Sequence, residues 1–217
     1  RITTSICACV VNDKGVIVAK PDPIILEWVE ATKQGDQDAF AELVYTFQDS
    51  VYNLCYRMLN DGGEAEDATQ EAFLRAYMNI KRYDADRSFK TWVMSIASNH
   101  CIDRLRKRRM KYVSLDDEPT AAALALSSRD PLPEQAMLRN ERDETIQAVL
   151  MELEPDYRVA VILRYWYDYS YAEIAEVMTT TESAIKSRLF RARRTLADLV
   201  NDTQDDDNLT NLQLKGS

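Results

Sequence analysis

Apolar residues recur at three- and four-residue steps along most of this chain. This spacing places them on one face of an α-helix. Long alternations of apolar and polar residues, which mark half-buried strands, are rare, and five glycines and six prolines leave few breaks in 217 residues. The pattern predicts an all-α fold. Two small helical domains, at residues 24–113 and 142–200, are joined by a flexible linker at 114–141.

Three segments depart from the helical pattern. In residues 1–23, ICACVV and VIVA flank NDKG, which predicts a short β-hairpin to which we assign no function. Residues 114–141 contain three prolines, clustered serines and acids, and no amphipathic period, as expected of a linker. Residues 201–217 begin with NDTQDDDN, which predicts a disordered acidic tail.

A capped helix is predicted at the start of the segment SYAEIAEVM, residues 170–178. Ser170 is followed three residues later by Glu173, which is the spacing of a capping box, so the helix begins at 170 or 171. Its apolar positions, at helical spacing, are Tyr171, Ile174, Ala175 and Met178. Three threonines at 179–181 then break the pattern, and one of them can cap a second helix.

The second helix separates apolar from basic side chains. At 100° per residue its inner face contains Ile185, Leu189, Ala192 and Leu196. Its outer face contains Ser183, Lys186, Ser187, Phe190, Arg191 and Arg194, with Arg188 and Arg193 on the flanks. Cations and Ser can hydrogen-bond base edges, an apolar ring can contact a thymine methyl, and the flanking arginines can neutralise phosphates. The two helices predict a helix-turn-helix; a solvated basic face on an ordinary bundle helix is the alternative.

Residues 63–80, GEAEDATQEAFLRAYMNI, predict a helix with a mixed outer face. Alanines and Phe73 point inward at helical spacing. The outward positions are Asp67, Gln70, Glu71, Leu74 and Met78. Exposed Leu and Met among acids favour a protein-binding face, whereas a solvated acidic helix with chance apolar residues is the alternative.

The next segment, KRYDADRSFKTW at 81–92, mixes aromatic residues with Lys, Arg and Asp and is predicted to be a loop leading into a helix. That helix ends in a basic run from Arg104 to Lys111. Aromatics beside cations suit unpaired bases, because rings stack on base faces while cations follow the backbone. For Phe89 and Trp92 the alternative is core packing, and for the basic run it is a solvated helix end.

Composition narrows the class of protein. The net charge of −9 is a poor guide to partners, because the excess of acids lies in the predicted linker and tail while the basic patches are local. No stretch of 18 apolar residues and no secretory leader is seen, which favours a cytoplasmic protein without membrane insertion. Four cysteines and one histidine do not form a metal-binding pattern, so we expect no metal and no cofactor.

Two segments together resemble a known family. EDATQEAFLRAY through RSFKTWVMSIASNHCIDRLRKRR, within residues 63–112, resembles the second conserved region of bacterial sigma factors. EPDYRVAVILRYW through SYAEIAEVM and AIKSRLFRARRTL, within residues 154–196, resembles their fourth region. The presence of these two regions alone resembles the extracytoplasmic-function (ECF) group, sigma-70 family group 4.

This resemblance implies roles that spacing does not supply. For the acidic helix, the resemblance implies docking on the clamp helices of the polymerase β′ subunit. For the fourth region, it implies contact with the β flap. The implied minus-ten DNA contacts, with duplex and melted promoter, are Tyr83, Asp86, Arg87, Ser88, Phe89, Asn99, Arg104, Arg106, Lys107 and Arg108. For the outer face of the second helix, the resemblance implies recognition of the minus-thirty-five element.

The resemblance also implies a non-enzymatic subunit that helps core RNA polymerase open promoters and that an anti-sigma factor inhibits. A stand-alone helix-turn-helix regulator would explain residues 170–196 but not the face around Leu74. An enzyme is disfavoured because the chain has no Gly-rich phosphate loop and no nucleophile–base constellation.

Overall fold

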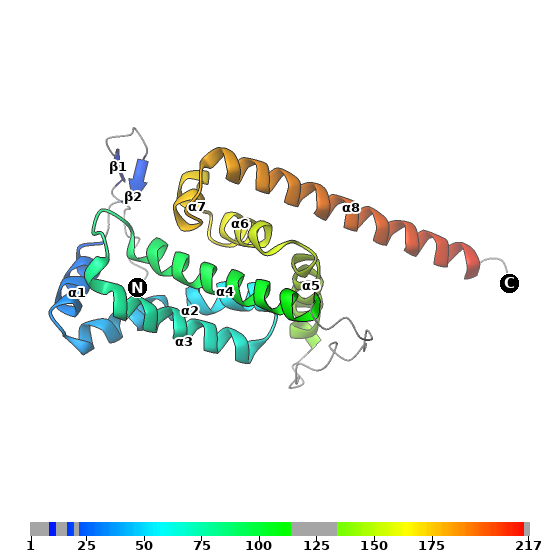
Figure 1. Cartoon of the computed structure of the whole chain (residues 1–217). Helices are drawn as coiled ribbons and strands as arrows, with labels where there is room; N and C mark the ends of the chain where they lie inside the picture. Colours follow the sequence, from blue (N-terminus) through cyan, green and yellow to red (C-terminus); the bar gives the residue numbers. More distant parts are fainter. Residues whose placement is uncertain (1–8, 12–16, 20–21, 114–133, 215–217) are drawn as a thin grey trace.

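The computed structural model describes residues 9–11, 17–19, 22–113 and 134–214, arranged as two blocks of helices (Figure 1). The first block contains α1 (Pro23–Lys33), α2 (Gln37–Leu59), α3 (Gly62–Asn79), the 3₁₀ helix η1 (Ile80–Arg82) and α4 (Phe89–Val113). The second contains α5 (Glu134–Met151), α6 (Pro155–Trp166), α7 (Tyr171–Val177) and α8 (Glu182–Leu214). The predicted all-α fold of two helical domains is confirmed.

The predicted N-terminal hairpin is also found. β1 (Cys9–Val11) pairs antiparallel with β2 (Ile17–Ala19), and Val10 lies opposite Val18. Among the described residues, β1 and β2 form a two-stranded sheet. A two-stranded hairpin is only marginally stable by itself, so the helices determine the fold.

Aspartates define where the first three helices begin. Asp22, Asp36 and Asp61 each accept a hydrogen bond from a backbone N–H in the first turn of α1, α2 and α3. Each bond satisfies a donor that the helix itself leaves unpaired. α2 ends at Asn60, whose φ of 56° lies in the left-handed region that Asn tolerates. A two-residue connection therefore returns the chain directly into α3.

Small side chains bring α3 close to its neighbours. Ala65, Ala68, Ala72 and Ala76 are fully buried where α3 packs against α2 and α4. Alanine has no side-chain bulk to separate the helix axes, and it is also the best helix former. The predicted inward face of residues 63–80 is confirmed, and the opposite face of α3 is left to solvent.

The second block packs α6, α7 and α8 around aliphatic side chains. Ile162 of α6, Ile174 of α7, and Ile185 and Leu189 of α8 are buried together in the core. This is the predicted inner face of the helix-turn-helix. Because one face of α8 is buried against α6 and α7, its opposite face is free to contact a partner.

The two blocks also contact each other. α4 lies along α6 and α7 (Figure 1). The hydroxyl of Tyr167 donates to the carbonyl of Ser50 at 2.5 Å, and the guanidinium of Arg57 lies 4.4 Å from the ring centroid of Trp166. The buried residues of both blocks form one hydrophobic cluster. The domains that the sequence separates are therefore packed together in this structure.

The predicted linker is too long at its C-terminal end. α5 begins at Glu134, so residues 134–141 are helical, and residues 114–133 lie outside the described part of the chain. The reason is local, since EQAMLRNE consists largely of good helix formers and contains neither glycine nor proline. Pro133 marks the boundary, because proline is tolerated before or at a helix start but not within it.

The prediction of a disordered tail is wrong for residues 201–214. α8 continues without a break to Leu214 (Figure 1). The composition is acidic, but no glycine or proline interrupts residues 201–214. Extending an existing helix avoids the unfavourable nucleation step, so the preceding turns of α8 carry the helix into this segment.

Candidate nucleic-acid interface

The helix-turn-helix is built from two capped helices. The side-chain oxygen of Ser170 accepts a hydrogen bond from Glu173 N at 3.2 Å, and the Glu173 carboxylate accepts one from Ser170 N at 2.8 Å. The hydroxyl of Thr181 accepts from Ala184 N at 3.2 Å at the start of α8. Between them Thr179 has a φ of 49°, which makes the turn sharp. The predicted capping box and threonine cap are confirmed.

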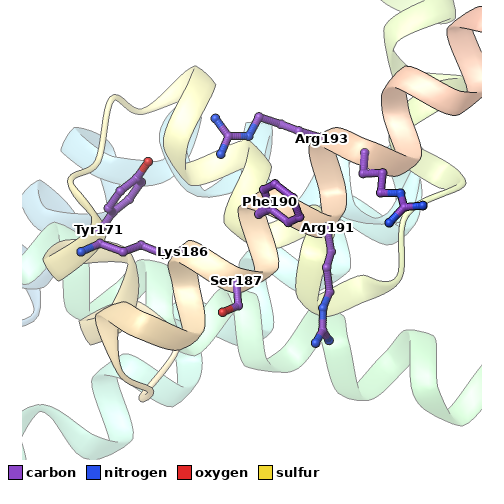
Figure 2. Close-up of a pocket in the computed structure, with 7 residues that line it drawn as sticks. Tyr171, Lys186, Ser187, Phe190, Arg191 and Arg193 are labelled. Atoms are coloured by element: carbon purple, nitrogen blue, oxygen red, sulfur yellow. The ribbon is translucent and has the colours of Figure 1, made fainter.

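An open hollow of about 740 Å³ lies on the outer face of α8. Figure 2 shows its lining residues, which are Tyr171, Lys186, Ser187, Phe190, Arg191, Arg193 and Arg194. The ring of Phe190 is 64% exposed near the middle of this surface. An exposed aromatic ring among cations has no stabilising role in the fold, so this face has the chemistry of a binding surface.

Neighbouring side chains orient the cations around the hollow. Lys186 Nζ lies 6.0 Å from the ring centroid of Tyr171, and Arg191 Nη1 is 3.3 Å from the hydroxyl of Tyr157. Arg188 differs from the rest because it is half-buried and approaches Asp156 of α6 at 4.0 Å. The predicted outward side chains are therefore exposed on one face of α8, and Arg188, predicted on the flank, turns toward the body of the domain.

The solvent face of α3 carries the second predicted surface. Leu74 is 54% exposed and Met78 is 74% exposed. Asp67 and Gln70 are exposed on the same helix, and Glu71 accepts a hydrogen bond from Arg75 Nε at 2.6 Å. The five side chains that the sequence placed outward do lie outward, with Glu71 partly covered by its pairing.

The loop before α4 differs from the sequence expectation. Tyr83 and Phe89 are 4% and 2% exposed, and their rings pack with Trp92 at centroid distances of 5.0 and 5.7 Å. Burial raises the pKa of Tyr83 to about 12, and its hydroxyl donates to the carbonyl of Arg87. Both rings are therefore part of the core beneath the loop in this structure, which for Phe89 is the core-packing alternative that the sequence left open.

Replacing Phe89 with Ala tests this structural role. Truncating a fully buried Phe costs about 3–5 kcal/mol, so we expect Phe89→Ala to lower the free energy of unfolding by that amount in chemical denaturation. Asp86→Ala is the matched control, because Asp86 is exposed in the same loop and surface changes stay within about 0.5 kcal/mol. Equal stability of the two variants would contradict the buried placement of Phe89.

The remaining loop and α4 residues are more accessible. Asp86 and Asn99 are exposed, Arg87 and Ser88 are half-buried, and Ser88 accepts a weak hydrogen bond from Thr91 N at 3.5 Å. Arg87 Nε is 2.5 Å from the Glu176 carboxylate of α7. The loop therefore presents a charged surface over an aromatic base.

Several arginines of the basic run at the end of α4 form ion pairs with acidic side chains of other helices. Arg104 and Arg108 both contact Glu64 of α3, the former at 3.6 Å. Arg106 lies 2.8 Å from Asp156 of α6, and Lys107 is exposed. The predicted cations are thus all on one helix, but only part of this set is unpaired in the described structure.

Both regions match known protein families. Residues 43–110 match Sigma-70 region 2, and residues 143–196 match Sigma-70, region 4. The chain is 38% identical over 183 residues to the "ECF RNA polymerase sigma factor SigW" of Bacillus subtilis (strain 168), covering 82% of this chain and 98% of that protein. The chain belongs to the ECF group of sigma-70 factors. A stand-alone helix-turn-helix regulator does not account for the region 2 match.

Two solved structures share the fold of this sigma factor. One is the structure of CnrH in complex with the cytosolic domain of CnrY, with a TM-score of 0.60, 21% identity, and coverage of 82% of this chain and 98% of that one. The other is the sigma factor RpoE in complex with the anti-sigma factor NepR from Bartonella quintana. Its TM-score is 0.56 at 22% identity, over 75% and 96% of the two chains. At these identities the likeness concerns the fold.

Sequence reasoning did not single out Tyr171 as part of the sigma factor's α8 surface. Its ring is half-buried and packs against the core, but it also lines the hollow, with Arg164 Cζ at 5.5 Å and Lys186 Nζ at 6.0 Å from its centroid. Arg193, which the sequence placed on the flank as a phosphate contact, lines the same hollow. No sequence signal existed for the second role of Tyr171.

In the part of the sigma factor that the structure describes, no group of three or more His, Cys, Asp or Glu side chains lies where it could hold a metal ion, and no helix is long and apolar enough to cross a bilayer. Cys55 and Cys101 are buried free thiols. A hydrogen bond between them lowers the pKa of Cys55 and, with burial, raises that of Cys101.

Proposed function

We propose that this sigma factor brings core RNA polymerase to promoters, recognises the minus-ten and minus-thirty-five elements, and helps to open the duplex. The observation that carries the proposal is the exposed face of α8. There the ring of Phe190 projects among cations on the second helix of a capped helix-turn-helix, which is the geometry of major-groove readers.

In the fourth region, the outer face of α8 reads the minus-thirty-five element. Lys186 and Arg191 donate to base edges or phosphates, and Ser183 and Ser187 can donate to either kind of base. The ring of Phe190 contacts thymine methyl groups. Arg194 and Arg193 lie at the margin of the hollow, where they neutralise phosphates and hold the helix in register.

In the second region, the outer face of α3 docks on the β′ clamp helices. Leu74 and Met78 form its apolar centre, and Asp67, Gln70 and Glu71 form a polar rim. This arrangement of exposed apolar side chains inside a charged border is typical of protein interfaces. We further propose that the fourth region contacts the β flap.

The surface of the loop and of α4 binds the minus-ten element. Asp86, Arg87, Ser88 and Asn99 are the base-contacting candidates, while Tyr83 and Phe89 hold the loop in place from beneath. The cations that follow promoter phosphates are Arg104, Arg106, Lys107 and Arg108. Capturing an extruded base offsets part of the unstacking cost, which is a few kcal/mol per base.

We also propose that the protein acts in the cytoplasm, catalyses no reaction itself and needs no cofactor. An anti-sigma factor is a further proposed partner, supported by the fold shared with the RpoE–NepR complex. Nucleotide addition belongs to the polymerase, so the sigma factor contributes binding energy and specificity.

Transcription with purified bacterial core polymerase tests the proposal. We expect core polymerase with this protein to transcribe a subset of a random promoter library, and the selected sequences to share two elements near positions −10 and −35. Core polymerase alone is the control. If the protein adds no transcripts above that control, the proposed function is wrong.

The ring of Tyr171 is expected to support DNA reading by Lys186. Tyr171→Leu removes the aromatic face, which contributes about 0.5–1 kcal/mol to an exposed cation–π contact. We therefore expect about a two- to five-fold loss of transcription from promoters with an intact minus-thirty-five element. Tyr171→Phe keeps the ring and should behave as wild type. Equal loss in both variants would assign the effect to the hydroxyl instead.

A further inference from the structure

The loop between η1 and α4 lies over a tyrosine whose ring is held on several sides. The ring centroid of Tyr83 lies 5.6 Å from that of Phe89 and 5.0 Å from that of Trp92. Lys33 Nζ of α1 lies 5.9 Å from the same centroid. Because side chains in a close-packed interior have little room to move, the body of the first block fixes where the Tyr83 hydroxyl lies.

The hydroxyl of Tyr83 reaches back into the loop. It donates a hydrogen bond to the carbonyl of Arg87, four residues further along the chain. Burial raises the pKa of Tyr83 to about 12, so the hydroxyl keeps its proton and remains a donor at neutral pH. This bond joins a ring of the core to the backbone of an exposed loop.

The loop is also closed on itself by Asp84. The side-chain Oδ1 of Asp84 accepts from Asp86 N at 3.0 Å, and the Asp84 carbonyl accepts from Arg87 N at 3.1 Å. The second bond closes a four-residue turn, and an aspartate side chain that bonds the backbone two residues on stabilises such a turn. Residues 84–86 are exposed, so their side chains face solvent while their backbone is held in one conformation.

These backbone bonds are independent of the second block. The side chain of Arg87 contacts Glu176 of α7, but its backbone N–H and carbonyl are bonded to Asp84 and Tyr83. Asp86 and Arg87, which we assign to base contact, lie within this turn, and Ser88 follows it directly. The bonded backbone therefore carries three of the four residues that we assign to minus-ten bases.

A backbone that is fixed before binding affects both affinity and specificity. A loop that already has its bound conformation loses less freedom when DNA arrives. It also cannot move to pair with a wrong base, whereas flexible loops can rearrange to accept several partners. A wrong base therefore leaves polar groups of the fixed loop unpaired, which costs binding energy.

We propose that Tyr83 and Asp84 are positioning residues that set the base specificity of the minus-ten loop. The Tyr83 hydroxyl and the Asp84 carboxylate hold the backbone of the loop and thereby aim the side chains of Asp86, Arg87 and Ser88. This inference rests on the proposed function, because it takes these three side chains to contact bases. Tyr83 and Asp84 act through the loop and do not touch DNA themselves.

Tyr83→Phe tests the inference, because it removes the hydroxyl and keeps the buried ring. Core polymerase with each variant transcribes a promoter library that is randomised across the minus-ten element and has a constant minus-thirty-five element. The quantity measured at each position is the ratio of transcripts from the preferred base to those from the least preferred base. We expect Tyr83→Phe to lower this ratio about two- to ten-fold at one or more positions, the range that corresponds to one hydrogen bond.

This ratio separates positioning from stability. A variant that only folds less well transcribes all promoters less and leaves the ratios unchanged. Tyr167→Phe is the matched control, because it removes a hydroxyl that donates to a backbone carbonyl outside the loop, that of Ser50 at 2.5 Å. We expect this control to keep the wild-type ratios. An equal loss of discrimination in both tyrosine variants would overturn the proposal.

Asp84 supplies a second test that leaves the core untouched. Asp84→Ala removes the acceptor for Asp86 N, whereas Asp84→Asn keeps an oxygen at that position. We expect Asp84→Ala to lower the ratios and Asp84→Asn to keep them. This pair decides the question if Tyr83→Phe does not fold, and equal ratios in the two Asp84 variants would then overturn the proposal.

Failure of the inference and failure of the proposed function give different results. If wild type discriminates between bases and a folded Tyr83→Phe variant keeps the same ratios, the positioning role is wrong and the proposed function stands. If wild type transcribes the library without any base preference in the minus-ten element, the proposed function is itself contradicted, because the loop then has no specificity to set.

Discussion

Leu74→Arg is expected to prevent assembly of this protein with core RNA polymerase and thereby to abolish promoter-selective transcription. Leu74 is 54% exposed at the centre of the outer face of α3. An arginine there would replace an apolar contact by a charge that must lose its water in the interface. A few residues near the centre of an interface contribute about 2 kcal/mol or more. We expect Leu74 to be one of them, so the dissociation constant should rise by at least about 30-fold.

The control for this variant is Ile24→Arg. Ile24 lies on α1 and is also 54% exposed, so the substitution adds the same charge at an equally exposed apolar position away from α3. Binding is measured by fluorescence anisotropy of the labelled sigma factor titrated with core polymerase. Wild-type binding by Leu74→Arg would show that the outer face of α3 is not the docking surface. A similar loss in both variants would mean that added positive charge alone weakens assembly.

The second large effect is expected on the outer face of α8. Lys186→Ala with Phe190→Ala removes a base-edge donor and the exposed ring that we assign to the minus-thirty-five element. Base contacts contribute about 1–3 kcal/mol each to discrimination. We therefore expect transcription from promoters with an intact element to fall by at least about 30-fold, and transcription from promoters with a scrambled element to change little.

Arg193→Ala separates base reading from phosphate binding. Arg193 lines the same hollow, but its Nε donates to the carbonyl of Leu189 at 3.3 Å, and we assign it to a phosphate. Losing a phosphate contact weakens binding nearly uniformly across sequences and lowers the salt dependence by about one unit. If Lys186→Ala with Phe190→Ala lowered transcription from intact and from scrambled promoters equally, the outer face of α8 would bind DNA without reading its sequence.

These predictions apply to the holoenzyme, because the free chain has its two blocks in contact. Glu176 lies against the minus-ten loop through Arg87, and Tyr167 donates to the carbonyl of Ser50. Exposed ion pairs contribute little individually, whereas the buried hydrogen bonds of Arg158 fix how the blocks pack.

The helices and their exposed faces were predictable from the sequence. Burial of Ala65, exposure of Leu74, the capping box of Ser170 and the outward ring of Phe190 were all expected. Each depends on residues three or four positions apart, because helix periodicity and capping bonds act over one turn. The two family regions are recognisable for the same reason, since their motifs lie on single helices or on the turns between them.

Two errors were also local in origin. The start of α5 at Glu134 and the extension of α8 to Leu214 contradict boundaries that were placed according to acidity and polarity. Acidic composition by itself does not end a helix; glycine, proline or a cap does. Residues 201–214 contain neither glycine nor proline, so nothing in this segment stops the helix that precedes it.

Only the tertiary structure decided which side chains in and beside the minus-ten loop are buried. Tyr83 lies in a loop, which has no period from which to assign faces, so the sequence could not distinguish a stacking ring from a buried one at this position. Tyr83 and Phe89 are buried because the ring of Trp92 from α4 and that of Phe47 from α2 pack around them. The contacts of the half-buried ring of Tyr171 with cations were unpredictable for a related reason, since these cations come from α6 and α8.

The packing of the two blocks was likewise invisible to sequence patterns. Arg106 and Asp156 are 50 residues apart, Arg87 and Glu176 are 89 apart, and Arg158 reaches a carbonyl 100 residues away. The sequence by itself determined the helices, their caps and the faces that they present. Which of those faces meet was decided by the tertiary structure, because charge pairing and the burial of apolar side chains depend on distance in space and leave no fixed spacing along the chain.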